Sequence, residues 1–136
     1  MKSINACLMF DGTCAEAMKF YQKSLKGDLQ IKLYNEVLGD QTPPSLYGRI
    51  MNARLTKGNA TLLGADIMPS PDFKFGNNFT VSISCDSKQE VDQLMLSLSK
   101  GGAVTMPGVE MPWAPYFGML RDKYGIDWMF SVENSK

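Results

Sequence analysis

Histidine is absent from the 136-residue chain. The side chain best suited to metal binding and to proton transfer near neutral pH is therefore missing. Any chemistry must use carboxylates, thiols, phenols or amines. Basic and acidic residues number 14 each, and this balance argues against a nucleic-acid or membrane partner, which a basic patch would attract. The apolar runs are only a few residues long, so we expect no transmembrane helix and no signal peptide.

Cysteine is scarce, and the three residues Cys7, Cys14 and Cys85 cannot all pair within one chain. Their spacing fits neither a zinc ribbon nor a Cys-x-x-Cys redox motif. A reducing cytoplasm is therefore the expected location. Cys14 lies at the start of a predicted helix, whose dipole would lower the pKa of its thiol. The alternative, which we favour, is that Cys14 is an inert small residue.

The sequence contains two capping boxes, Thr13-x-x-Glu16 and Ser87-x-x-Glu90, which lie 74 residues apart. In each, the hydroxyl accepts a bond from a backbone N–H of the first helical turn, and the glutamate reaches back to the cap. A glycine ends each predicted helix, as is common after the last helical residue. The chain is therefore predicted to contain two copies of one module. The 74-residue offset relates Ala17 to Val91, Phe20 to Leu94, Tyr21 to Met95 and Gly27 to Gly101.

Each half is predicted to contain a strand, a helix and three further strands, from alternating and helical hydrophobic periods. The first half has predicted strands 3–10, 28–37, 47–57 and 60–66, a helix from about 13 to 26, and a loop at 39–46. The second half has predicted strands from about 78 and at 103–106, 116–122 and 126–133, a helix from about 88 to 100, and a loop at 107–115. We expect one domain over residues 1–136, with module 1 at about 1–67, a linker at about 68–77 and module 2 at about 78–136.

Aromatic residues are the first candidates for lining a cavity, because ligand pockets are mostly apolar. Packing in the core is the alternative for each of them. Trp113 is favoured because it lies in a predicted loop. The candidates are Phe10, Tyr47, Trp113, Tyr116, Phe117 and Trp128.

Two carboxylates, Glu36 and Glu110, are weak candidates for a catalytic base, a role that burial would support by raising the pKa. The alternative is a solvated charge or a partner for Arg49, Arg54 or Arg121. Asp122 is predicted to stabilise a turn with Gly125.

An ordered set of short motifs spans nearly the whole chain. The motifs are Ile4-Asn5, Phe10-Asp11-Gly12, Cys14-Ala15-Glu16-Ala17, Phe20-Tyr21, Leu25-Lys26-Gly27, Leu98-Ser99-Lys100-Gly101-Gly102 and Asp122-Lys123-Tyr124-Gly125-Ile126-Asp127-Trp128. This set resembles the vicinal oxygen chelate superfamily, in its PhnB-like branch. That superfamily includes glyoxalase I, extradiol dioxygenases and the fosfomycin- and bleomycin-resistance proteins. The resemblance implies an α+β fold of two βαβββ modules, whose curved mixed sheets surround a cavity, and it implies a homodimer.

In metal-dependent relatives of this kind, the ligands come from the first and last strands of the modules. The resemblance and the 74-residue offset place those positions at Ala6, Leu62, Thr80 and Met129. Such side chains do not suit a divalent cation that prefers imidazole and carboxylate. We therefore expect no divalent metal at the usual site and predict no other cofactor.

Asn52 is a further departure, because PhnB-like chains often carry histidine in this run. An asparagine can orient a ligand by hydrogen bonds but cannot act as a base. The candidate ligand-pocket residues are therefore Phe10, Asn52, Thr80, Trp113, Trp128 and Met129.

The favoured hypothesis is a cytoplasmic homodimer that binds a small organic ligand without the usual metal. Whether it is an enzyme stays open. One alternative is a metal-dependent lyase, isomerase or dioxygenase with ligands elsewhere, for example Glu36 and Glu110. Another is a bleomycin-type drug-binding resistance protein. A methyltransferase is disfavoured, because no glycine-rich strand–turn–helix is present to hold S-adenosylmethionine.

Overall fold

The computed structural model describes Met1 to Glu133, so the last three residues of the predicted second module lie outside the described part. The chain divides into two compact units, residues 1–74 and 75–136. The first unit contains β1 (Cys7–Phe10), α1 (Cys14–Leu25), β2 (Asp28–Leu33), a short α2 (Tyr34–Leu38), two 3₁₀ turns (Gly39–Gln41 and Pro44–Leu46), β3 (Ile50–Lys57) and β4 (Ala60–Asp66). The second contains β5 (Val81–Cys85), α3 (Lys88–Leu98), β6 (Ala103–Met111), β7 (Ala114–Arg121) and β8 (Asp127–Val132).

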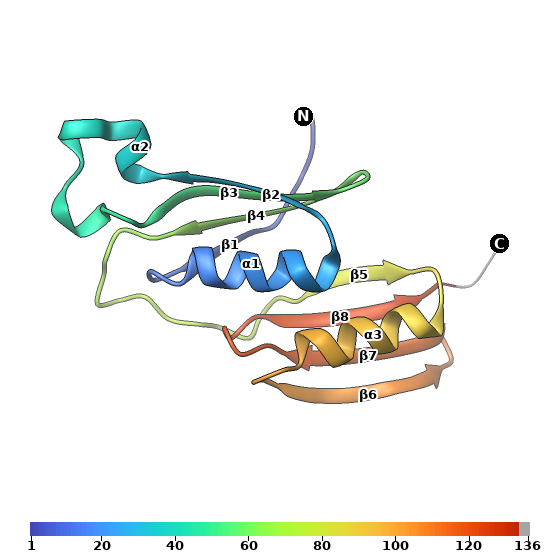
Figure 1. Cartoon of the computed structure of the whole chain (residues 1–136). Coiled ribbons are helices and arrows are strands. Elements are labelled where there is room, and N and C mark those ends of the chain that lie inside the picture. Colours follow the sequence, from blue (N-terminus) through green and yellow to red (C-terminus); the bar gives the residue numbers. More distant parts are fainter. Residues whose placement is uncertain (134–136) are drawn as a thin grey trace. The chain divides into compact units, whose positions relative to one another are not determined.

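Both units have the same topology, with one long helix against one four-stranded sheet (Figure 1). The strand order is β1-β4-β3-β2 in the first sheet and β5-β8-β7-β6 in the second. In each sheet the first strand pairs in parallel with the last, and the remaining pairs are antiparallel. The predicted α+β fold of two βαβββ modules is therefore confirmed. Neither sheet closes on itself.

Each long helix packs on one face of its own sheet at a glycine. A Cβ on Gly64 of β4 would lie 2.9 Å from Met18 Sδ and 3.2 Å from Cys14 Sγ of α1. In the second unit, a Cβ on Gly118 of β7 would collide with Met95 of α3. These close approaches bury one face of each sheet and leave the other without a helix from its own unit. No helix in the described part of the chain is long and apolar enough to cross a membrane.

Two predicted elements differ from the structure. The predicted strand 28–37 ends at Leu33, and residues from Tyr34 form the short α2. The predicted loop 107–115 is instead a hairpin, because β6 continues to Met111 and β7 begins at Ala114. Pro107 is tolerated there because β6 is an edge strand with irregular pairing.

The serine bond of one of the two predicted capping boxes forms. Ser87 Oγ accepts from the Glu90 N–H at 3.2 Å. Thr13 makes no side-chain cap bond, and Asp66 Oδ1 instead accepts from the N–H of Cys14, the first residue of α1, at 3.0 Å. The first module therefore caps its helix with a residue from a different strand.

The predicted helix-ending glycines also differ. Gly101 has the expected positive φ of 76°. In the first module the left-handed residue is Lys26, with φ of 58°, and Gly27 does not adopt a positive φ. Gly27 is required for another reason, because a Cβ there would lie 2.7 Å from the Thr56 carbonyl oxygen.

Candidate functional site

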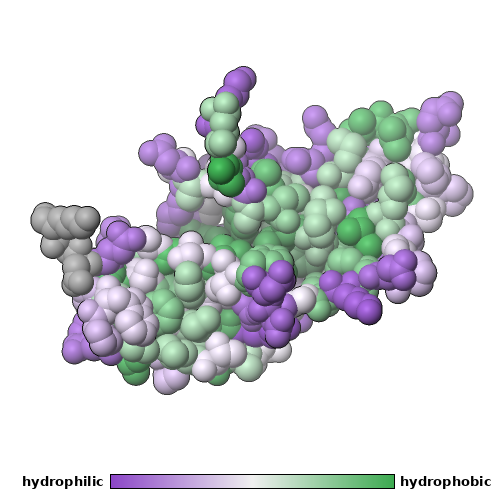
Figure 2. All heavy atoms as spheres, turned by 180° about the vertical axis from the view of Figure 1, so that it is seen from behind, coloured by the Kyte–Doolittle hydropathy of each residue, from purple (hydrophilic) through white to green (hydrophobic). Residues whose placement is uncertain are grey.

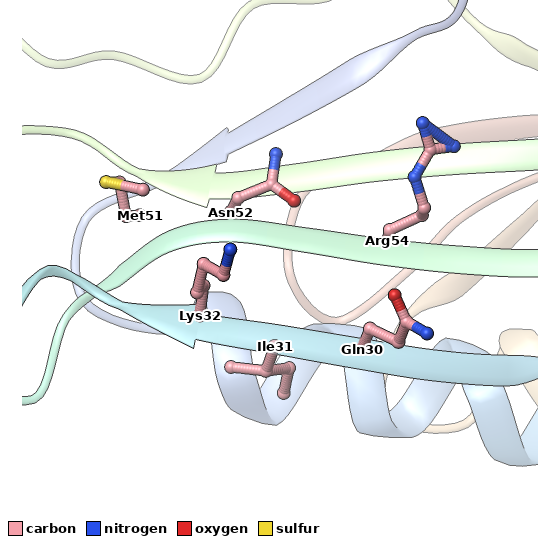
Figure 3. A pocket seen from close by; sticks show the side chains of 6 residues that line it. All are labelled: Gln30, Ile31, Lys32, Met51, Asn52 and Arg54. Carbon is pink, nitrogen blue, oxygen red and sulfur yellow. The ribbon is translucent and has the colours of Figure 1, made fainter. Parts of the chain in front are cut away.

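The face of the first sheet away from α1 carries polar side chains on neighbouring strands. In the β2–β3 pair, Gln30 lies opposite Arg54 and Lys32 lies opposite Asn52. Because side chains alternate along a strand, these four share one face. The intervening Ala53 is fully buried on the α1 side. Figure 3 shows that the four polar side chains project from the same side of the two strands, whereas that of Ile31 projects from the other side.

A hollow of about 300 Å³ lies over these two strands (Figure 3). It is lined by Gln30, Ile31, Lys32, Met51, Asn52 and Arg54. This volume is at the lower end of the range for sites that bind small molecules. The hollow could therefore hold a small molecule or one group of a larger one.

A β-bulge shapes one end of the hollow. The pairing of β2 with β3 changes register between Lys32 and Leu33, because Lys32 lies opposite Asn52 while Leu33 lies opposite Ile50. Met51 is the extra residue of β3 at this point. Bulges redirect side chains and are frequent beside functional sites. Here the bulge brings an apolar thioether to the edge of a polar face.

The corresponding face of the second sheet is less polar. It presents thioether, aromatic and hydroxyl side chains, and Phe117 packs edge-on against Trp113 with ring centroids 6.0 Å apart. Its single arginine, Arg121, is bound by both carboxylate oxygens of Asp127 at 2.9 Å each. The residues that the register places on this face include Ser82, Ser84, Met106, Phe117, Met119, Met129 and Ser131. The two copies of the module have therefore diverged in the chemistry of this face.

The structure corrects the register of two predicted metal positions. Leu8 and Phe10 are buried on the α1 side, and Leu62 is buried on the same side, opposite Leu55. The residue of β4 that shares a face with Arg54 is Leu63. The expected position at Leu62 was therefore wrong by one residue.

The 74-residue offset fails for the strands because the two strand-to-helix turns differ in length. Leu8 and Phe10 point to the helix side in β1, and their counterparts in β5 are Ile83 and Cys85, 75 residues later. The first turn, residues 11–13, is one residue longer than the second, residues 86–87. Thr80 therefore corresponds to Asn5 rather than to Ala6.

The corrected positions still do not suit a divalent metal. In the first unit they carry the amide of Asn5 and the aliphatic side chain of Leu63, and in the second the hydroxyl of Thr80 and the thioether of Met129. None of these is the imidazole or carboxylate that hard or borderline divalent cations prefer. Within residues 1–133, no three His, Cys, Asp or Glu side chains are grouped to hold a metal ion.

The candidate pocket residues occupy different environments. Asn52 lies in the hollow of the first unit. Phe10 and Trp128 are fully buried in the cores of their units. Trp113 is 63% exposed in the turn between β6 and β7, and Thr80 precedes β5 half-buried. Met129 lies half-buried on the second sheet, opposite Met119.

The two carboxylates considered as bases are exposed rather than buried. Glu36 lies on α2 and is exposed. Glu110 lies on β6 with a side chain that is 77% exposed, and it pairs with Lys88 at 3.0 Å. Neither has the desolvated surroundings on which the proposed base role depended.

Asp66 is a buried carboxylate that sequence reasoning did not single out. It is 1% exposed. Its Oδ1 accepts from the backbone N–H groups of Gly12 and Cys14, at 2.8 and 3.0 Å, and its Oδ2 accepts from that of Ile50 at 2.9 Å. It therefore fixes both the start of α1 and the start of β3, the strand that carries Asn52 and Arg54. The only sequence signal was an acidic residue at the end of an apolar strand.

Cys14 is fully buried, which agrees with the favoured prediction of an inert small residue rather than a thiol activated by the helix dipole. Burial, with the nearby charge of Asp66, raises the pKa of its thiol to about 12. Burial and a hydrogen bond that its thiol donates to the Glu90 carboxylate likewise raise the pKa of Cys85 to about 12. Both thiols are therefore expected to be unreactive in the native protein.

This can be measured by thiol labelling. With iodoacetamide at pH 8, we expect only Cys7 to react in the native protein, more slowly than a small-molecule thiol because partial burial raises its pKa, and Cys14 and Cys85 to react only after unfolding. Because the folded protein keeps both buried thiols neutral, their raised pKa contributes to the free energy of unfolding. This contribution is complete below the unfolded pKa of 9.0 and is lost as the pH rises towards about 12. Three rapidly alkylated cysteines in the native protein would contradict this.

Large apolar side chains are exposed at several places in the two units. Figure 2 shows apolar residues reaching the surface on one side of the molecule. The exposed large apolar side chains include Ile4, Met9, Tyr47, Met68, Phe79, Leu96, Val104 and Trp113. Exposed apolar surface of this kind often marks an interaction site.

The fold, in which each sheet has one open face, can be compared with those of known proteins. A glyoxalase/bleomycin resistance protein/dioxygenase family enzyme from Burkholderia phytofirmans PsJN shares the fold with a TM-score of 0.68, at 14% identity over 96% of this chain and 97% of that one. The family model described as 3-demethylubiquinone-9 3-methyltransferase matches residues 2–131. The chain belongs to this family, within the PhnB-like branch of the vicinal oxygen chelate superfamily.

Several relatives are similar over almost the full length. Protein PA1353 from Pseudomonas aeruginosa has a TM-score of 0.83 and 32% identity, covering 99% of this chain and all (100%) of that one. A putative 3-demethylubiquinone-9 3-methyltransferase, PhnB protein, from Bacillus cereus has a TM-score of 0.79 and 28% identity, covering 96% and 99%. Protein YjdN of Escherichia coli (strain K12) is 26% identical, covering 92% of this chain and 91% of its own length.

Proposed function

We propose that this protein binds a small organic molecule on the open face of its first sheet, without the metal that related folds use. The observation that supports this best is the hollow over β2 and β3, which combines four polar side chains with the apolar side chain of Met51. Ligand sites have this composition, with a few placed polar groups in apolar surroundings. Asn52 lies in its lining, opposite Lys32.

The metal-free part of the proposal rests on donor chemistry. The chain has no histidine. The positions from which related folds recruit ligands carry amide, aliphatic, hydroxyl and thioether groups after correction of the register. Asn52 can donate and accept hydrogen bonds but cannot serve as a general base. Binding and orientation of a ligand are therefore the functions that these side chains support.

The proposal also includes a homodimer in the cytoplasm. Exposed apolar side chains on the strands provide surface that a second copy could cover. Cys7, Cys14 and Cys85 form no disulfide, which agrees with a reducing compartment.

The methyltransferase named in the family description gains no support from the strand–turn–helix segments of this chain. Binding a nucleotide-like cofactor at such a turn uses backbone N–H groups at the start of the helix. In the first module, the N–H groups of Gly12 and Cys14 already donate to Asp66. The turn is therefore occupied by a carboxylate of the protein itself.

A titration of metal-depleted protein tests the proposal. The ¹⁵N-labelled protein is dialysed against EDTA and titrated with benzoate, phenyl phosphate and benzyl alcohol while ¹H–¹⁵N spectra are recorded. We expect at least one probe to shift the amides of residues 30–33 and 51–54 with saturation, and added Zn²⁺ or Mn²⁺ to leave this unchanged. Binding that requires the added metal would contradict the metal-free proposal, and absence of any saturable shift would contradict the site.

A further inference from the structure

We propose that the ligand of this face is a small organic anion, whose carboxylate or phosphate group lies between Lys32 and Arg54. This inference rests on the proposed function and specifies the chemical class of the ligand. Lys32 and Arg54 occupy neighbouring cross-strand positions on one face, since Lys32 lies opposite Asn52 and Arg54 opposite Gln30. Both line the same hollow.

Arg54 is the arginine that the described structure leaves without a carboxylate. Arg49 pairs with Asp11 at 2.8 Å and Arg121 pairs with Asp127 at 2.9 Å. No ion pair joins Arg54 or Lys32 to any residue in the described range 1–133. Asp28, one cross-strand position further along the same face, makes no ion pair with Arg54.

Two like charges on diagonal cross-strand positions lie within reach of one another and repel. The lining of the hollow contains no carboxylate that would offset this repulsion. An anion placed between the two side chains would accept charge-assisted hydrogen bonds from both, and the guanidinium of Arg54 can bind a carboxylate or phosphate with two parallel bonds.

The side chains around the two cations fit the rest of such a ligand. The amides of Gln30 and Asn52 lie opposite the two cations and can each donate a further hydrogen bond to an oxyanion. The bulged Met51 supplies apolar surface in the lining. Methionine adapts its shape to different apolar partners. A free inorganic ion would leave this apolar surface unused, whereas an organic anion would cover it.

The second module makes a useful comparison within the same chain. Its corresponding face carries Met106 opposite Met119, where the first module has Gln30 opposite Arg54. Its own arginine, Arg121, is already neutralised by Asp127. The unpaired positive charge is therefore a property of one module and not of the fold.

The inference is tested with benzoate, phenyl phosphate and the neutral benzyl alcohol, titrated into the full chain after EDTA dialysis. We expect benzoate or phenyl phosphate, or both, to bind, and benzyl alcohol to bind at least about tenfold more weakly. Arg54→Gln and Lys32→Gln should each weaken anion binding by about tenfold, because each removes one charge-assisted partner. The two anions distinguish a carboxylate site from a phosphate site, and binding of either supports the inference.

Two further variants control the experiment. Lys19→Gln removes an exposed charge from α1 and should leave binding unchanged, and Arg54→Lys should retain part of the affinity lost in Arg54→Gln. Circular dichroism and the melting midpoint establish that each variant is folded. Equal binding of benzyl alcohol and benzoate, unaffected by Arg54→Gln, would overturn the anion inference while leaving the proposed function intact. Absence of binding by all three probes would overturn both.

Discussion

Replacing Asp66 by alanine should lower the free energy of unfolding by about 4 kcal/mol, one of the two largest effects expected in this chain. The substitution removes a buried carboxylate that accepts three backbone N–H bonds and leaves those donors without a partner. Hydrogen bonds to a charged group contribute about 1.5–3 kcal/mol each, and buried donors without partners add a penalty. Urea denaturation followed by circular dichroism measures the change.

Asp66→Asn keeps the shape of the side chain but replaces one accepting oxygen by a donor. We expect it to lose about half as much stability as Asp66→Ala. Asp40→Asn, at an exposed position in the first 3₁₀ turn, serves as the matched control and should change stability by less than about 0.5 kcal/mol. Equal stabilities of Asp66→Ala and Asp40→Asn would show that the three hydrogen bonds do not hold the first module together.

Replacing Asp122 by alanine should cost about 3–4 kcal/mol in the second module. Asp122 is 3% exposed. Its Oδ1 accepts from the N–H groups of Tyr124 and Ile126 at 2.8 and 3.1 Å, and its Oδ2 accepts from the indole Nε1–H of Trp128 at 2.8 Å. The carboxylate therefore fixes the turn between β7 and β8 and the largest side chain of that core.

The Trp128→Phe substitution removes the indole hydrogen bond to Asp122 and keeps the two hydrogen bonds of the turn, so it measures the indole bond by itself. It should cost less than Asp122→Ala, because the turn bonds to Asp122 remain. The double variant should be less destabilised than the sum of the two single variants, since both remove the same indole bond. Thermal denaturation of the four proteins measures this coupling, and strict additivity would contradict a direct contribution of the Trp128–Asp122 bond.

The sequence predicted the fold well because its signals were local. Capping residues, period-two alternation and turn glycines identify helices and strands, and each of these signals comes from residues that lie close together in the sequence. The turn role of Asp122 is an example, because its partners Tyr124 and Ile126 lie within four residues. The same local signals repeated in both halves, and so the βαβββ order could be predicted twice.

The cap of α1 was not predictable in this way. Thr13 has the residue type of a cap but makes no side-chain cap bond, and the first helical N–H, that of Cys14, donates instead to Asp66, 52 residues further along the chain. A contact between residues that lie far apart in the sequence produces no periodic pattern in a single sequence. The burial of Cys14 beside Asp66 follows from the same contact, and it reverses the expected direction of the thiol pKa.

The candidate site was predicted only in part, because an error of one residue in the register assigns every side chain of a strand to the wrong face of the sheet. A one-residue difference between the two strand-to-helix turns moved Ala6 off the position that the repeat suggested, and Leu62 is one residue from the open-face position at Leu63. Asn52 was identified from the sequence, but its neighbours Gln30 and Lys32 come from another strand. The pairing of β2 with β3, which places these residues beside Arg54, could be seen only in the structure.

The central claim is that the first module binds a small organic ligand on its open face without a metal. The most direct test is the ¹H–¹⁵N titration of EDTA-dialysed protein with benzoate and phenyl phosphate. The account predicts saturable shifts confined to residues 30–33 and 51–54, with affinity unchanged when Zn²⁺ is added. Shifts that appear only with the metal, or that map away from β2 and β3, would contradict it.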